Sequence, residues 1–268
     1  MTSKKPPSPA DFPSHHTVTI TPPQSPPRAT HPAPPNILLL LHGLGDTAAA
    51  FTSFARALNL PETTVVTIQA PTPLPFDLGG FHWGDDVSFD SATGTLDMDA
   101  GFKRATTLLV HEVIRGVLVQ KCGYRPREIL VLGFGQGGMA ALVAAREMAN
   151  RERTQGASAG VDADADADAD ASLSGVISIG APYPLSGSTV GRKSRTPVLL
   201  VGGREPTAVS DGAIQRTKQV FEFVEVHQYA RKGDGMPRNR EEMMPVMQFF
   251  ARRLRSWQGV PEGSVEIT

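Results

Sequence analysis

The chain contains a single cysteine, Cys122, in 268 residues, so it cannot form an intrachain disulfide. This composition is typical of proteins that fold in a reducing compartment. Apolar runs are short, and none approaches the roughly 20 residues that span a bilayer. Lys4 and Lys5 are followed by proline-rich polar sequence and not by the apolar core of a secretory signal. These absences predict a cytoplasmic protein, with the nucleus as an open alternative, and no membrane-spanning segment.

The chain also lacks an excess of charge of either sign. Lys and Arg number 26 and Asp and Glu number 27, for a formal net charge of -1. Domains that bind nucleic acid usually carry a strong basic patch, so this balance predicts no nucleic-acid partner. A hydrophobic fraction of 40% over this length is sufficient for the core of one large domain. The oligomeric state stays open.

Two segments lack the periodic apolar pattern of folded elements. Residues 1–35 are rich in Pro, Ser, Thr and His, which predicts a disordered arm, with docking to a protein partner as an alternative. Residues 151–172 carry aspartates alternating with alanine from Asp162 to Asp170, which predicts a solvated surface insertion. A calcium loop needs a glycine and a glutamate that this tract lacks, so we predict no metal site. The folded domain is expected at residues 36–257, and residues 258–268 form a tail.

The rest of the chain alternates strand-like and helix-like patterns. Continuous apolar runs, typical of buried parallel strands, lie at residues 37–41, 64–68, 129–132, 176–179 and 198–201, and a more alternating run at 221–229 predicts a strand near the sheet edge. Helical spacing occurs at residues 47–58, 98–119, 138–150, 211–219 and 240–256. This order predicts a single α/β domain with a mostly parallel central sheet flanked by helices.

Residues 130–139 read Leu-Val-Leu-Gly-Phe-Gly-Gln-Gly-Gly-Met. The sequence resembles the strand-to-helix turn G-x-S-x-G of α/β-hydrolases, in which a serine exposes its hydroxyl above the sheet. Here the glycines of the turn are present, at Gly133 and Gly137, but Gly135 occupies the position of the serine. The motif therefore predicts the turn and excludes a serine nucleophile at its centre.

A second motif, Leu-His-Gly-Leu-Gly-Asp at residues 41–46, follows the first apolar run. In α/β-hydrolases a His-Gly loop at this place donates one backbone N–H to the oxyanion hole, and the residue after the nucleophile donates the other. The corresponding donors are Leu44 and Gln136. Together the two motifs indicate an α/β-hydrolase fold.

With these motifs the chain resembles the phospholipase/carboxylesterase family, which includes the acyl-protein thioesterases. The resemblance covers roughly residues 36–255 and also includes Gly101 after an acidic stretch and Glu-Met-Met at 242–244. It implies an α/β-hydrolase fold, cleavage of acyl thioesters or oxygen esters by a Ser, Asp and His triad, and no cofactor.

The resemblance also places the triad positions on this sequence. The serine falls on Gly135, the acid on Glu205 before Pro206, and the histidine on Met236, six residues before Glu242. A glutamate can orient a catalytic histidine in this fold. Gly135 has no side chain to attack a carbonyl, and the Met236 thioether cannot serve as a general base.

Other side chains are candidates for the binding cleft: His42 in the first loop, His82 and Trp83 at a later loop, and Asp234 just before Met236. We interpret His42 as a structural hydrogen-bonding residue and His82 with Trp83 as part of the rim. Asp234 could act as a base only if burial raised its pKa strongly. His227 is interpreted as a residue of the sheet face.

The sequence thus predicts a catalytically impaired family member that keeps a cleft for an acyl ester, a small ester or a lipid-modified ligand. Without a triad member, an oxyanion hole and binding leave about 10³- to 10⁴-fold acceleration over water, orders of magnitude below an intact enzyme. Two alternatives stay open. One is an active ester or thioester hydrolase with unconventional catalytic residues, and the other is a non-catalytic interaction module.

Overall fold

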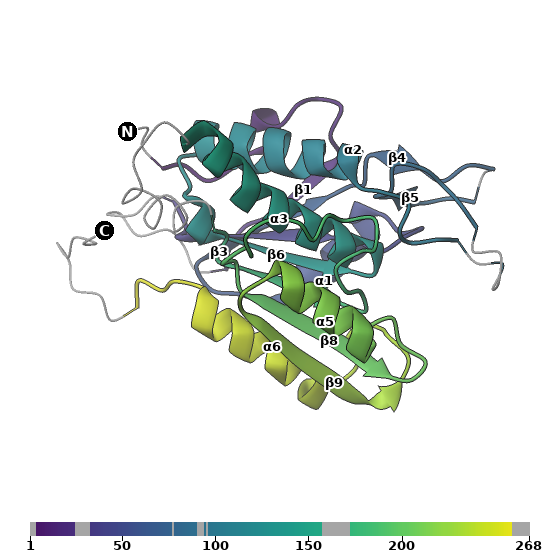
Figure 1. Cartoon of the computed structure of the whole chain (residues 1–268). Helices are drawn as coiled ribbons and strands as arrows, with labels where there is room; N and C mark the ends of the chain where they lie inside the picture. The colour runs from purple at the N-terminus through teal and green to yellow at the C-terminus, as the bar shows by residue number, and fades with distance from the viewer. Residues whose placement is uncertain are drawn as a thin grey trace.

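A computed structural model describes residues 4–24, 33–76, 78–89, 94, 96–156 and 172–258, with the backbone alone for residues 150–156. Its centre is a seven-stranded sheet (Figure 1). In spatial order the strands are β1 (Val18–Thr21), β3 (Thr63–Ile68), β2 (Asn36–Leu41), β6 (Ile129–Phe134), β7 (Gly175–Ile179), β8 (Val198–Arg204) and β9 (Val224–Lys232). Only β1 runs antiparallel to its neighbour, so the predicted mostly parallel sheet is confirmed.

The inner strands form where apolar runs can be buried on both faces of the sheet. Every residue of β2 and of β3 is buried, as expected for strands covered by helices on both sides. The last strand, β9, lies at an edge of the sheet, and Tyr229 is its only buried residue. This confirms the edge position predicted from its more alternating pattern.

The helices are α1 (Ala48–Leu58), α2 (Lys103–Thr106) with its wider, π-type continuation η2 (Thr107–Lys121), α3 (Gln136–Gly156), α5 (Asp211–Val220) and α6 (Arg240–Arg253). Short elements are the 3-10 turns η1 (Pro9–Asp11) and η3 (Pro126–Glu128) and the hairpin of β4 (Thr72–Pro73) with β5 (Phe81–His82).

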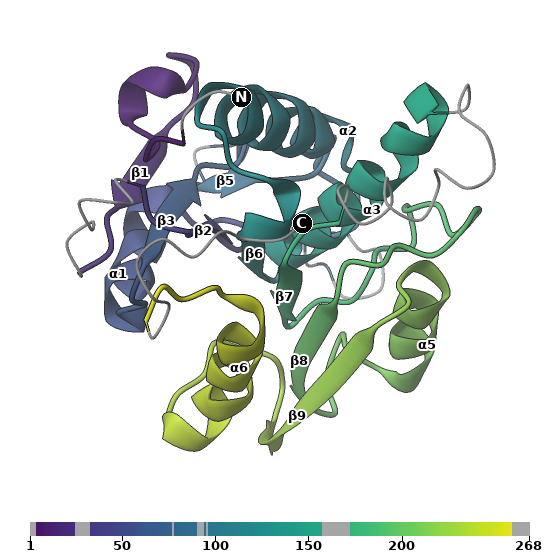
Figure 2. The same cartoon turned by 90° about the vertical axis from the view of Figure 1, so that its left-hand side faces the viewer.

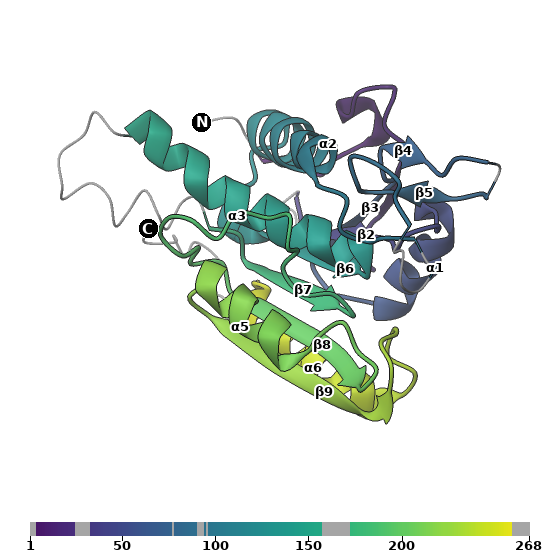
Figure 3. The ribbon, with the colours of Figure 1, turned by 45° about the vertical axis from the view of Figure 1, so that its right-hand side comes forward.

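Helices cover both faces of the sheet, and each face has its own apolar core. Figure 2 shows α1 and α6 on one face and α2, α3 and α5 on the other, and Figure 3 shows α5 and α6 on opposite sides of β8 and β9. Phe51 and Phe249 belong to the core beneath α1 and α6, whereas Leu109 and Leu142 belong to the core beneath η2 and α3. This is the three-layer arrangement of an α/β domain.

The expectation of a disordered arm at residues 1–35 is wrong for residues 4–24 and for the buried residues 33–35. The first of these segments contains η1 and β1, and β1 pairs with β3 over four residues. Phe12 is buried in the core, and the Lys4 ammonium lies 2.8 Å from the Glu128 carboxylate. Composition suggested disorder because the segment has few apolar residues, but those few pack against elements that come later in the chain. Residues 1–3 and 25–32 lie outside the described residues.

The helix expected from residue 98 begins at Lys103 instead. The Asp85 carboxylate accepts the Lys103 and Arg104 N–H groups, each at 2.8 Å, and so caps the start of α2. Asp99 meanwhile accepts the Ser186 N–H at 3.1 Å, which holds residues 97–101 as a loop against the segment after β7. Local periodicity could not reveal the boundary, because both partners are distant in sequence.

The loops after β2, β6, β8 and β9 leave the same edge of the sheet, since these strands are parallel. Ligand sites of open α/β sheets lie at this carboxyl edge. The predicted acidic insertion falls mainly on residues 157–171, which lie outside the described residues. Within the described part of the chain, no helix combines the length and apolar character needed to cross a bilayer.

Candidate active site

The turn at Gly135 has the geometry predicted from its glycines. Strand β6 ends at Phe134, helix α3 begins at Gln136, and Gly135 between them has φ of 52°. Its N–H donates to the Ile179 carbonyl of β7 at 2.9 Å, and its carbonyl accepts the Gly138 N–H at 2.9 Å. The residue at the nucleophile position therefore sits on a sharp bend at positive φ, which is costly for most side chains and free for glycine.

The flanking glycines are needed for close packing. A Cβ on Gly133 would lie 2.2 Å from the Gly137 carbonyl oxygen, and one on Gly137 would lie 2.4 Å from the His42 carbonyl oxygen. A Cβ on Gly135, in contrast, would meet no atom closer than the Met98 sulfur at 4.0 Å. The turn is therefore closely packed at Gly133 and Gly137, whereas space remains around Gly135.

This contrast predicts different outcomes for two alanine variants. Gly137→Ala should destabilise the fold by about 3 kcal/mol or more, because two backbone segments must move apart. Gly135→Ala should cost only about 1 to 2 kcal/mol, the penalty of positive φ for a residue with a Cβ. Denaturant midpoints of both variants measure the difference. Equal losses would show that the bend is not packed as described.

His42 is wholly buried and serves as a structural residue of the first loop. Its Nδ1–H donates to the Gly43 carbonyl at 2.8 Å, and its Nε2 accepts the Ala70 N–H at 3.0 Å. Since a backbone N–H can only donate, this network fixes a neutral ring with the proton on Nδ1. Burial lowers the pKa of His42, which maintains the neutral form. This network agrees with the interpretation of His42 as a structural hydrogen-bonding residue. It does not agree with a His42 ring that faces a ligand.

A network of buried side chains connects the first loop to the start of α3. The Trp83 indole N–H donates to the His42 carbonyl at 2.9 Å, and the Trp83 backbone N–H donates to the Gln136 side-chain oxygen at 2.7 Å. The Gln136 amide nitrogen donates in turn to the Met98 carbonyl at 3.1 Å. Trp83 is fully buried and is therefore not the rim residue that was expected. Met98 was not among the residues predicted for the site.

The two expected oxyanion donors are the backbone N–H groups of Leu44 and Gln136. Both lie beside residues that are in contact with one another. A Cβ on Gly43 would meet the Phe134 ring at 2.9 Å, and Gly137 packs on the His42 carbonyl, so the loop of Leu44 and the first residue of α3 are adjacent. Within the described part of the chain, neither the Leu44 nor the Gln136 backbone N–H donates to a protein acceptor. Two such donors beside one bend can bind a carbonyl or carboxylate oxygen.

Asp234 organises the loop that follows β8. Its Oδ1 accepts the Gly203 N–H at 2.9 Å and the Thr207 hydroxyl at 2.7 Å, and its Oδ2 accepts the Ala208 N–H at 2.7 Å. Both oxygens are therefore engaged in holding residues 203–208, which include Glu205. The carboxylate is positioned as a structural acceptor and not as a proton-abstracting group.

The three positions that the family resemblance assigns to the triad follow parallel strands that end at the same edge of the sheet. Gly135 follows β6, Glu205 follows β8 and Met236 follows β9. Asp234, two residues before Met236, and Phe134, one residue before Gly135, both lie within 4 Å of the point where a Cβ on Gly180 would be. Glu205 is exposed to solvent, while Met236 packs with Phe134 against the core beneath α6. A thioether thus occupies the position to which the family resemblance assigns the histidine.

His82 lies on β5 and is 2% exposed. Its Nδ1 has no hydrogen-bond partner in the described structure, and burial together with the nearby Arg104 charge lowers the pKa of His82. A neutral, buried ring of this kind does not form the open rim that the sequence suggested.

A cleft of about 430 Å³ lies between α2 with η2, α3 and the loop after β7. Its lining mixes apolar and charged side chains: Phe102, Lys103, Thr106, Thr107, His111, Val143, Arg146, Glu147, Tyr183, Ser186, Gly187 and Ser188. The four residues predicted for the binding cleft do not line this cleft; they are His42, His82, Trp83 and Asp234. The sequence offered no signal for this cleft, because its walls come from segments that are unremarkable by themselves.

A parallel α/β sheet, a tight strand-to-helix turn at positive φ and a His-Gly loop beside it define the class of α/β-hydrolase folds. Comparison with known families narrows this class. The profile of the phospholipase/carboxylesterase family matches residues 27–254, and the chain belongs to that family.

Three known proteins are similar to this chain. An uncharacterized hydrolase of Schizosaccharomyces pombe is 27% identical over 239 residues, which is 87% of this chain and 89% of that protein. The crystal structure of esterase PE8 superposes with a TM-score of 0.65 at 19% identity, covering 89% of this chain and 99% of the esterase. Acyl-protein thioesterase 2 of Zea mays superposes with a TM-score of 0.56 at 20% identity over 89% and 99% of the two chains. These two structures support the fold.

Proposed function

We propose that this protein is a catalytically impaired member of the phospholipase/carboxylesterase family that binds an acyl ester, or the corresponding acid, without cleaving it. One observation carries the proposal: the strand-to-helix turn keeps its packing and its positive φ while its centre is Gly135. The bend that presents a nucleophile is retained, and the nucleophile is absent. Met236 at the histidine position removes the general base as well.

Binding is supported by the N–H groups of Leu44 and Gln136. They lie beside a bend with room at its centre, and no described protein group accepts from them. In an active hydrolase such donors stabilise the charge that develops on the substrate oxygen. With no covalent step, the same donors hold the oxygen of a bound ester or carboxylate.

The alternative of an active enzyme with unconventional residues receives less support. Asp234 was the candidate base, but both of its oxygens accept hydrogen bonds from the loop at residues 203–208. The alternative of a module that docks through a free proline-rich arm is also weakened, because residues 4–24 pack on the domain.

Purified protein should turn over p-nitrophenyl octanoate and octanoyl-coenzyme A orders of magnitude more slowly than an intact hydrolase, since it lacks both nucleophile and base at the bend. It should bind octanoate, measured by calorimetry. Gly135→Asn should weaken this binding, because asparagine tolerates positive φ and its side chain fills the open centre of the bend. Turnover by the unmodified protein at the rate of an intact hydrolase, if it survives purification, would overturn the proposal.

Gly79→Asn is the matched control. Gly79 also has positive φ, at 72°, and a Cβ there would meet nothing within 4 Å. The substitution is therefore the same in chemistry and backbone region but lies in another loop. Octanoate binding that falls equally in both variants would place the ligand elsewhere.

A further inference from the structure

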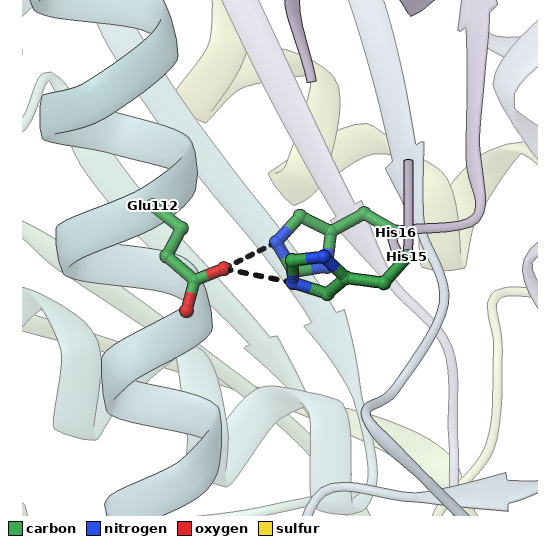
Figure 4. Close-up of side chains that lie close together, drawn as sticks. All are labelled: His15, His16 and Glu112. Carbon is green, nitrogen blue, oxygen red and sulfur yellow. Dashed lines mark hydrogen bonds and ion pairs between the residues drawn. The ribbon is translucent and has the colours of Figure 1, made fainter. Parts of the chain in front are cut away.

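Two adjacent histidines of the N-terminal segment face a glutamate of η2. The His16 backbone N–H donates to the Pro13 carbonyl at 3.0 Å, which closes a turn. Both imidazoles point towards Glu112 on the helix. His15 Nε2 lies 3.4 Å and His16 Nε2 2.5 Å from the same oxygen, Oε2 of Glu112 (Figure 4). Three metal-ligating side chains from two distant segments thus converge on one point.

The cluster is accessible without being fully exposed. The side chains of His15, His16 and Glu112 are 69%, 9% and 34% exposed, respectively. The turn that carries the histidines is fixed on both sides, by buried Phe12 before it and by β1 after it. The Lys121 ammonium also donates to the Asp11 carbonyl at 2.7 Å. Such anchoring reduces the entropy lost when the rings are held in one arrangement.

We propose that His15, His16 and Glu112 bind a divalent transition-metal ion of the Zn²⁺ class. The three donor atoms lie within 4.8 Å of one another. Zinc takes imidazole nitrogen at about 2.0–2.1 Å and carboxylate oxygen at about 2.0–2.2 Å, so tetrahedral donors lie roughly 3.3 Å apart. The His15 to Glu112 distance of 3.4 Å fits this value, and the His16 to Glu112 distance of 2.5 Å must lengthen through a small side-chain rotation.

The protons balance in a simple way. A carboxylate only accepts, so in the metal-free cluster each Nε2 that bonds to it carries a proton. When the ion binds, each neutral ring gives its Nε2 lone pair to the metal and carries its proton on Nδ1. Three protein ligands leave a fourth position for water, as in open zinc sites. Occupancy would attach the turn of residues 13–16 to η2.

Calorimetric titration of the full chain with ZnCl₂ tests the proposal, because binding should be saturable at one equivalent. His16→Ala and Glu112→Gln should each weaken Zn²⁺ binding at least about tenfold, since loss of even an outer-shell partner costs 10- to 100-fold. Zn²⁺ should also slow amide hydrogen exchange in β1 and the preceding turn. This second measurement is independent of any hydrolase activity.

His227→Ala is the matched control, because it removes a histidine of β9 on the opposite edge of the sheet. It should leave Zn²⁺ affinity unchanged. Circular dichroism identifies variants that have lost the fold, and Glu112→Gln keeps the shape of its side chain in any case. Unchanged Zn²⁺ affinity in folded His16→Ala and Glu112→Gln, or the same loss in His227→Ala, would overturn the proposal.

Discussion

Combining Gly135→Ser with Met236→His is expected to produce a protein that reacts with a fluorophosphonate probe and hydrolyses p-nitrophenyl octanoate. Its turnover should exceed that of either single variant by at least about tenfold, because a nucleophile and its base act as a unit. The single serine variant should stay nearly inactive, since a hydroxyl without a neighbouring base remains protonated. Initial rates and probe labelling of all three variants measure the effect.

The structure has space for a serine side chain at position 135, but the backbone conformation there makes the substitution destabilising. A Cβ at position 135 has its nearest neighbour at 4.0 Å, the sulfur of Met98, so the serine fits. Its positive φ should cost about 1 to 2 kcal/mol of stability. Adding Met98→Ala should increase probe labelling further by uncovering the hydroxyl. A folded double variant with no gain over either single variant would contradict the assignment of Met236 to the histidine position.

Deleting residues 1–24 is expected to lower the melting temperature by roughly 6–12 °C, from a loss of about 3 kcal/mol or more. The deletion removes β1 from the edge of β3 and withdraws Phe12 from the core. It also removes Lys4 from the Glu128 carboxylate, which is 4% exposed, and leaves Arg255 at 3.6 Å as its ion-pair partner. Differential scanning calorimetry of the truncated and full chains gives the shift.

Phe12→Ala separates the packing contribution from the strand pairing. Phe12 is 7% exposed, and its truncation should account for much of the loss. Phe76→Ala makes the same change at a side chain that is 84% exposed and should alter stability by no more than about 0.5 kcal/mol. A truncated chain as stable as the full one would show that residues 4–24 do not contribute to the fold.

Much of the fold could be predicted from the sequence because its signals are local. The apolar runs of β2, β3, β6, β7 and β8 mark buried strands wherever they occur, and the order of strands and helices leaves few topologies. The turn at Gly135 was predictable for a similar reason, since glycine spacing reflects backbone conformation and close approach within a few residues. The assignment of Gly135 to the serine position and of Met236 to the histidine position also required only the sequence and the family resemblance.

The roles of the surrounding side chains were decided by tertiary contacts. Asp234 resembled a substitute base in the sequence, but in the structure it accepts three hydrogen bonds from another loop. His82 and Trp83 resembled rim residues, but the fold buries both.

By itself the sequence determined a mostly parallel α/β domain and the glycine-lined bend without a nucleophile. Only the tertiary structure decided that residues 4–24 pack on the domain and that His16 meets Glu112, 96 residues further along the chain. The physical reason is the range of the interactions. Conformational preferences act between near neighbours in the chain, whereas burial and side-chain pairing depend on segments that only folding brings together.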